Sequence, residues 1–174
     1  MKAEALRADF PDNIPIPDLL VRLCDYTEQI GCDRFVVGDF ELSESGRQDV
    51  LAWFDGDRQA ADQFVVFAFD KSLSLYGYWR YAGQPLDEAP IVYLDGEAQH
   101  NTVLANTLEE FLGLLALGYR RIGLVKKWPQ VFEPGADTLR FREWLRSNGG
   151  IEPPQDGYTV VVEQVRAKHP DLST

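Results

Sequence analysis

The chain has little of what metal and redox sites are built from. Its 174 residues include two cysteines, Cys24 and Cys32, and two histidines, His100 and His169. The cysteines form no Cys-x-x-Cys pair and no Cys/His cluster, so the sequence predicts neither a zinc site nor a disulfide framework. We expect two reduced, structural thiols, a cytoplasmic location, and no metal or other cofactor.

Long apolar runs are also lacking. No run approaches the roughly 18 residues that a membrane-spanning helix needs, and the charged N-terminal sequence has no apolar signal-peptide core. We therefore predict that the protein neither crosses a membrane nor is secreted through a signal peptide. The hydrophobic content of 45% and the charged content of 26% are ordinary for a soluble protein, and the length suits one domain over residues 1–174.

Positive charge is missing from the middle of the chain. The net charge is −11; residues 1–119 hold 21 acidic against 8 basic residues, a balance of −13, and residues 120–174 hold 7 against 9, a balance of +2. No Lys or Arg occurs between Arg80 and Arg120. Nucleic acid is a poor partner, because phosphate binding needs clustered cations. A basic protein is a plausible partner through long-range attraction; the alternative is that the acidic surface only serves solubility.

The common catalytic motifs are absent: the sequence has no GxSxG, GxGxxG, P-loop, HExxH or EF-hand pattern. His100 stands beside Asn101 in a predicted turn, where it is either a general base or, as we favour, a solvated loop residue. Paired carboxylates could perform acid–base chemistry, but every pair falls on turn residues, which favours a role in the turns. These pairs are Asp55/Asp57, Asp87/Glu88 and Asp95/Glu97.

The most informative stretch covers residues 90–118. Apolar runs at residues 91–94 and 102–105 predict two strands, and the Asp95-Gly96 pair between them is a turn signal. Thr107 and Glu110 have the spacing of a helix capping box, and Gly118 is placed as a left-handed helix C-cap. The stretch therefore predicts a strand, a turn, a second strand and a capped helix.

The segments before this stretch predict a helix and three strands. Residues 1–16 form an extended arm; a helix covers residues 17–30, with Pro17 as its first residue and Gly31 at its end. Strands are expected at residues 34–42, 64–69 and 73–81, and residues 48–54 form a short helix or an irregular segment. The connections are too short for crossover helices, so the strands should form an antiparallel meander.

The C-terminal third predicts a helical extension, residues 119–174. A short strand is expected at residues 122–125, followed by a helix over residues 139–147. Tyr158, Val161, Val162 and Val165 follow a helical period, which predicts a helix over residues 157–169. His169 lies at its end, where a cation suits the helix dipole.

The strand at residues 73–81 is rich in aromatic side chains. Alternation places Tyr76, Tyr78 and Arg80 on one face. Tyrosine and arginine dominate many binding interfaces, so this face could be a protein-binding ladder. The alternative is that the face packs beneath a helix.

The order of these segments carries a family resemblance. Its features are the helix ending at Gly31, the strand pair around Asp70-Lys71-Ser72, the Pro90–Leu94 strand followed by Asp95-Gly96-Glu97, and the Ala105–Leu112 segment with its Phe111-Leu112 pair. The chain resembles the SUKH superfamily, which includes fungal cell-wall assembly regulators and many bacterial immunity proteins. The resemblance implies an α+β fold: a single mixed, mainly antiparallel sheet flanked by helices, without shared catalytic residues.

The resemblance implies a non-enzymatic protein-binding module, such as an immunity protein that neutralises a toxin domain. A basic toxin domain would suit the acidic first 119 residues, and the module should be a monomer or a homodimer. The two alternatives are a small-molecule-binding or hydrolytic enzyme that uses His100 or a loop carboxylate pair, and a structural subunit of an assembly. The predicted binding residues are Tyr76, Tyr78, Arg80, Asp87, Glu88, Asp95 and Glu97.

Overall fold

A single five-stranded sheet forms the centre of the molecule. The computed structural model describes residues 3–12, 14–31, 35–97, 99–125 and 134–172. Each strand pairs antiparallel with the next one along the chain, so the spatial order is the sequence order. The predicted α+β fold and antiparallel meander are confirmed. The strands are β1 (Phe40–Leu42), β2 (Phe64–Asp70), β3 (Leu75–Trp79), β4 (Ile91–Leu94) and β5 (Thr102–Ala105).

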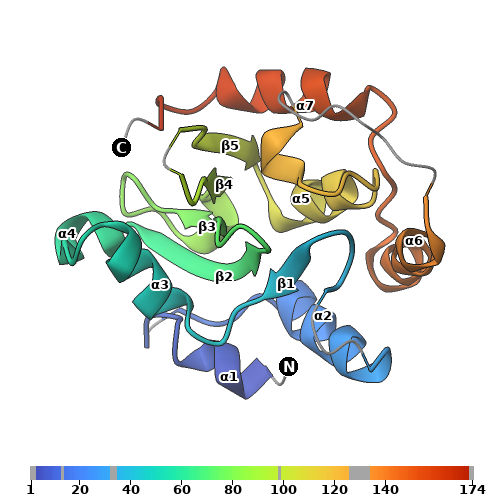
Figure 1. Cartoon of the computed structure of the whole chain (residues 1–174), viewed down its shortest axis with the longest axis horizontal. Helices are drawn as coiled ribbons and strands as arrows, with labels where there is room; N and C mark the ends of the chain where they lie inside the picture. The colour runs from blue at the N-terminus through green and yellow to red at the C-terminus, as the bar shows by residue number, and fades with distance from the viewer. Residues whose placement is uncertain (1–2, 13, 32–34, 98, 126–133, 173–174) are drawn as a thin grey trace.

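Helices surround this sheet (Figure 1). They are α1 (Ala3–Arg7), α2 (Asp18–Gln29), α3 (Gly46–Trp53), α4 (Arg58–Ala61), α5 (Leu108–Leu115), α6 (Ala136–Gly149) and α7 (Gly157–Arg166), with 3₁₀ turns η1 (Leu86–Glu88) and η2 (Ile122–Leu124). In Figure 1, α3 and α4 lie to one side of the sheet, α5 and α6 lie to the other, and α7 runs across the top beside β5. Within the described part of the chain, no helix is long and apolar enough to cross a membrane.

The sheet has an apolar core on each face, because strand side chains alternate between the two faces. The larger core contains Phe67, Tyr76 and Tyr93 of the sheet together with residues of α2, α5 and α6. The smaller core joins the opposite face of the sheet to α3 and α4. Helix α7 contributes Val162 to the larger core and Val165 to the smaller one. It therefore covers the edge of the sheet at β5, where an open strand would invite aggregation.

The central stretch folds as the sequence predicts, with one shift. β4 and β5 have the predicted bounds, and the Thr107 hydroxyl accepts the Glu110 amide N–H at 3.2 Å. The Glu110 carboxylate, however, accepts the N–H of Asn106 at 2.8 Å rather than that of Thr107. The second hydrogen bond of the predicted capping box therefore forms to Asn106, the residue before the N-cap, instead of to the N-cap residue Thr107. Gly118 has the expected left-handed conformation, with φ of +89°.

Two N-terminal predictions are corrected. The arm at residues 1–16 is not wholly extended, because it contains α1, whose Leu6 is fully buried. The Arg7 guanidinium holds the turn that follows by donating to the Ile14 carbonyl at 2.6 Å. The predicted strand at residues 34–42 begins outside the described residues at Arg34, and only its last part, β1, is strand. Residues 46–53 form α3, which resolves the ambiguous segment as a helix.

The strand predicted at residues 122–125 is wrong, because this segment is the 3₁₀ turn η2. Gly123 lies flat against the Tyr93 ring, and a Cβ atom there would be 2.3 Å from ring carbons. The chain turns at this point because only glycine permits that approach. The two helices expected after it are present as α6 and α7, so the helical C-terminal extension is confirmed. Cys24 is free and buried, while Cys32 lies outside the described residues.

Candidate functional site

The predicted aromatic ladder belongs to the core. Tyr76 and Tyr78 are 1% and 2% exposed, and their rings pack beneath α5 and beside Phe67. Arg80 lies just beyond the strand, where its Nε donates to the Gln84 carbonyl at 2.8 Å and closes a turn. Tyr76 and Tyr78 share one face of the sheet, as predicted, but helix α5 covers that face. These tyrosines cannot meet a partner.

Two of the predicted acidic pairs shape turns. Asp95 is 4% exposed; its amide N–H donates to the Asn101 side chain at 2.9 Å, and its carbonyl accepts the Trp53 indole N–H at 3.3 Å. Of this pair, only Glu97 is exposed. Asp57 caps α4 by accepting amide N–H groups of its first turn. Asp95 is thus a structural residue rather than a contact residue.

The remaining pair lies on an acidic surface that we call the acidic end. Ile91 pairs with Ala105, so β4 begins where β5 ends, and η1 and the start of α5 lie at the same end of the sheet. All four carboxylates of these two segments are exposed. The acidic end consists of Asp87, Glu88, Glu109 and Glu110.

A buried polar network holds the opposite end of these strands. Asp70 accepts the Ser72 amide N–H at 2.8 Å and the Tyr76 hydroxyl at 3.3 Å. Ser74 accepts the Tyr93 hydroxyl at 2.9 Å. Burial raises the pKa of Asp70, although the donated hydrogen bonds oppose the shift. The sequence indicated only a turn here, because the tyrosines that complete the network come from β3 and β4.

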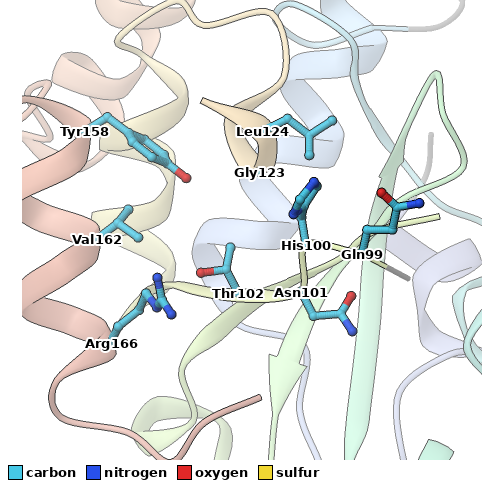
Figure 2. A pocket seen from close by; sticks show the side chains of 9 residues that line it. All are labelled: Gln99, His100, Asn101, Thr102, Gly123, Leu124, Tyr158, Val162 and Arg166. Atoms are coloured by element: carbon cyan, nitrogen blue, oxygen red, sulfur yellow. The ribbon is translucent and has the colours of Figure 1, made fainter. Parts of the chain in front are cut away.

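One cavity lies between α7, η2 and the connection from β4 to β5. It has a volume of about 290 Å³. Figure 2 shows Tyr158, Val162 and Arg166 of α7 on one side, and His100 and its neighbours on the other. The lining residues are Gln99, His100, Asn101, Thr102, Gly123, Leu124, Tyr158, Val162 and Arg166.

Four polar side chains of this cavity have no hydrogen bond or ion pair to the described residues: Gln99, His100, Arg166 and the Tyr158 hydroxyl. In Figure 2 the Tyr158 hydroxyl points into the space between α7 and the connection. Burial raises the pKa of Tyr158, while the charge of Arg166 opposes the shift. The Tyr158 hydroxyl therefore stays protonated at neutral pH and can donate a hydrogen bond. The cavity offers donors to an incoming acceptor group.

Among the described residues, the lining of this cavity contains His100 and the Thr102 hydroxyl but no carboxylate, thiol or serine. A histidine base is normally oriented by a third group and placed beside a nucleophile or a bound water. Among the described residues, no group of three or more His, Cys, Asp or Glu side chains could hold a metal ion.

A second cavity extends the first one along β5. It has a volume of about 350 Å³ and shares Asn101, Thr102 and Arg166 with the first. It continues along β5 to Val103 and along the segment after α7 to Leu172. We call the two cavities together the α7 groove.

The α7 groove leads toward the acidic end. His169, at the end of α7, contacts the Asn106 side chain at 3.2 Å, and the Asn106 amide group donates to Glu110. The sequence did not predict this groove, because its walls are separated by more than 50 residues. The helical period of α7 indicated its buried face, but only the fold placed that helix against β5.

No family model, no curated protein and no solved structure matches the chain.

Proposed function

We propose that the chain is a non-enzymatic protein-binding module that holds a segment of a partner protein in the α7 groove. The observation that carries this proposal is that polar side chains without a partner among the described residues converge on one groove. His100, Arg166 and the Tyr158 hydroxyl can all donate hydrogen bonds to the carbonyl or carboxylate oxygens of a peptide. Arginine and tyrosine are also enriched among the residues that dominate binding energy.

The charge distribution supports a basic partner. The acidic end lies beyond the groove, and the first 119 residues carry a balance of −13. Such a surface attracts a basic protein over distance and speeds its association. The partner class suggested by the SUKH resemblance is a toxin domain, which the module would neutralise in the cytoplasm by covering its working surface.

The test uses purified proteins encoded beside this gene, with binding measured by calorimetry. Replacing both groove residues, His100→Ala with Arg166→Ala, should weaken binding about 30-fold, since a dominant contact contributes about 2 kcal/mol or more. The control is Arg140→Ala, an exposed arginine on α6 that forms only a local ion pair. Equal affinity of the double variant and the control would contradict the groove assignment.

The acidic end is tested by the rate of association. Asp87→Lys with Glu88→Lys should slow association at low salt and leave the dissociation rate nearly unchanged, because exposed rim charges mainly steer the encounter. High salt should remove the difference between the variant and the unaltered protein. If none of the neighbouring proteins binds, the protein-binding function itself is contradicted.

A second candidate is a small-molecule-binding or hydrolytic enzyme that uses His100. The observation that favours it is the position of His100 on the lining of a cavity of about 290 Å³. Turnover of ester or phosphoester substrates that His100→Gln abolishes would support it. The third possibility, a structural subunit, predicts a broad apolar patch, whereas the exposed large apolar side chains, Leu73, Tyr81, Leu139 and Val160, come from different segments.

A further inference from the structure

A separate cavity, with no lining residue in common with the α7 groove, lies between the segment after α1 and helices α3 and α4. It has a volume of about 240 Å³. Its apolar lining comes from Pro11, Val50, Leu51, Ala61 and Phe64. We call it the Asp9 pocket, because one carboxylate in its lining has an unusual environment.

Asp9 is 8% exposed, and only one of its two oxygens is bonded to a described residue. Its Oδ1 accepts the Arg47 amide N–H at 3.0 Å, which ties the segment after α1 to the first turn of α3. Its Oδ2 is fully buried and has no hydrogen-bond partner among the described residues. Buried carboxylate oxygens are almost always bonded, because desolvation without a replacement donor is costly. The unfilled acceptor therefore calls for a donor from outside the chain.

The other charges of the pocket limit what this donor can be. Asp62 pairs with Arg47 at 3.6 Å, so these two charges offset each other. Arg58 lines the same pocket and has no ion pair to any described residue. A simple cation would satisfy Asp9 but would face the charge of Arg58. A ligand with charges of both signs satisfies both residues.

We propose that the Asp9 pocket binds a small zwitterion: an amino acid with an aliphatic body. Its ammonium group pairs with the Asp9 carboxylate, and its carboxylate accepts from the Arg58 guanidinium. Its hydrocarbon part lies against the apolar lining. This inference is independent of the proposed function, because it uses none of the residues of the α7 groove or the acidic end.

The experiment titrates the full-length protein with defined probes and follows binding by calorimetry and by amide chemical shifts. L-leucine and 6-aminohexanoate place the two charges at short and long spacing, which identifies the separation that the pocket accepts. Leucinamide lacks the carboxylate, and 4-methylpentanoate lacks the amine. We expect one of the zwitterions to bind at least tenfold more tightly than either singly charged probe.

Two variants assign the binding to the pocket. Asp9→Asn keeps an oxygen for the Arg47 amide but loses the charge, and Arg58→Gln alters an exposed side chain that forms no ion pair with a described residue. Each should weaken zwitterion binding about tenfold to a hundredfold, the usual effect of losing a charged hydrogen bond. The control is Asp12→Asn, an exposed acid on the same segment that does not line the pocket.

Three results would overturn the proposal. One is that neither zwitterion binds at millimolar concentration. Another is that leucinamide binds as tightly as leucine, which would remove the role of Arg58. The last is that Asp9→Asn only raises the melting temperature and leaves zwitterion binding unchanged, which would make Asp9 a buried charge solvated by water alone.

Discussion

At the scale of single residues, hydrogen bonds constrain the buried Asp70 carboxylate. It is 1% exposed and accepts hydrogen bonds from the Ser72 and Ser74 amides and from the Tyr76 hydroxyl. These bonds shape the hairpin between β2 and β3. Gly96 of the next connection packs against this hairpin, with space for no Cβ beside the Ser72 carbonyl. Asp70 therefore organises two loops, although burial makes its charged form costly.

This cost leads to a prediction for Asp70→Asn. Because burial raises the pKa of Asp70 above its ordinary value of 3.8, the folded state binds this proton more readily than the unfolded state. The free energy of unfolding therefore falls as pH rises from 3.8 through the raised pKa. The asparagine variant should lose this part of the pH dependence, as measured by urea unfolding at a series of pH values. Glu97→Gln, at an exposed acid, is the control and should keep the dependence.

At the scale of elements, α7 is the piece on which the candidate site depends. Tyr158, Val162 and Val165 are buried against the sheet, and they cover the edge at β5. The end of the helix is fixed by His169, which contacts the Tyr81 hydroxyl at 3.4 Å and the Asn106 side chain at 3.2 Å. The helix thus forms one wall of the α7 groove.

The environment of His169 predicts that helix α7 is less stable at low pH. Burial, together with the charge of Lys168, lowers the pKa of His169 below 6.5, against the opposing effect of Glu110. Below pH 6.5 the unfolded state takes up this proton first, so stabilisation is lost as pH falls through that range. Hydrogen exchange in α7, corrected for its intrinsic pH dependence, should show weaker protection in acid. His169→Gln should remove the effect; equal acid sensitivity in both proteins would contradict this assignment.

At the scale of the whole molecule, aromatic side chains hold the larger core together. Phe111 of α5 is fully buried and contacts the rings of Phe40, Phe67 and Tyr76, so one side chain joins a helix to three strands. Helices α2 and α6 extend the same core, where the Tyr26 ring lies 4.9 Å from that of Trp144. The sheet and the C-terminal extension therefore share one core.

A cavity at the centre of that core should destabilise the entire fold. Phe111→Ala is expected to lower the free energy of unfolding by about 3–5 kcal/mol, the usual cost of removing a buried aromatic ring. Leu139→Ala, at a side chain on α6 that is 55% exposed, should change it by less than about 0.5 kcal/mol. Denaturant unfolding followed by tryptophan fluorescence measures both. Similar losses in the two variants would contradict the central role of Phe111.

The local signals were sufficient for the elements near the middle of the chain. The strands at β4 and β5 were predicted with their ends, because short apolar runs bounded by turn residues need no distant information. The turn at η2 was missed because its cause, the Tyr93 ring against Gly123, lies 30 residues away. The helix α1 was missed for a similar reason, since its Leu6 is held by a core built from the rest of the chain.

The sequence by itself determined the α+β class, the antiparallel meander and the helical period of α7, because hydrophobic spacing and turn chemistry act between near neighbours. It also determined the segment free of basic residues at 81–119. Only the tertiary structure decided that α5 buries Tyr76 and Tyr78, that α7 forms a groove with His100, and that one oxygen of Asp9 has no partner among the described residues. These outcomes depend on which distant surfaces pack together. The spacing of apolar residues along a helix or strand specifies which face is buried, but it does not specify which element covers that face.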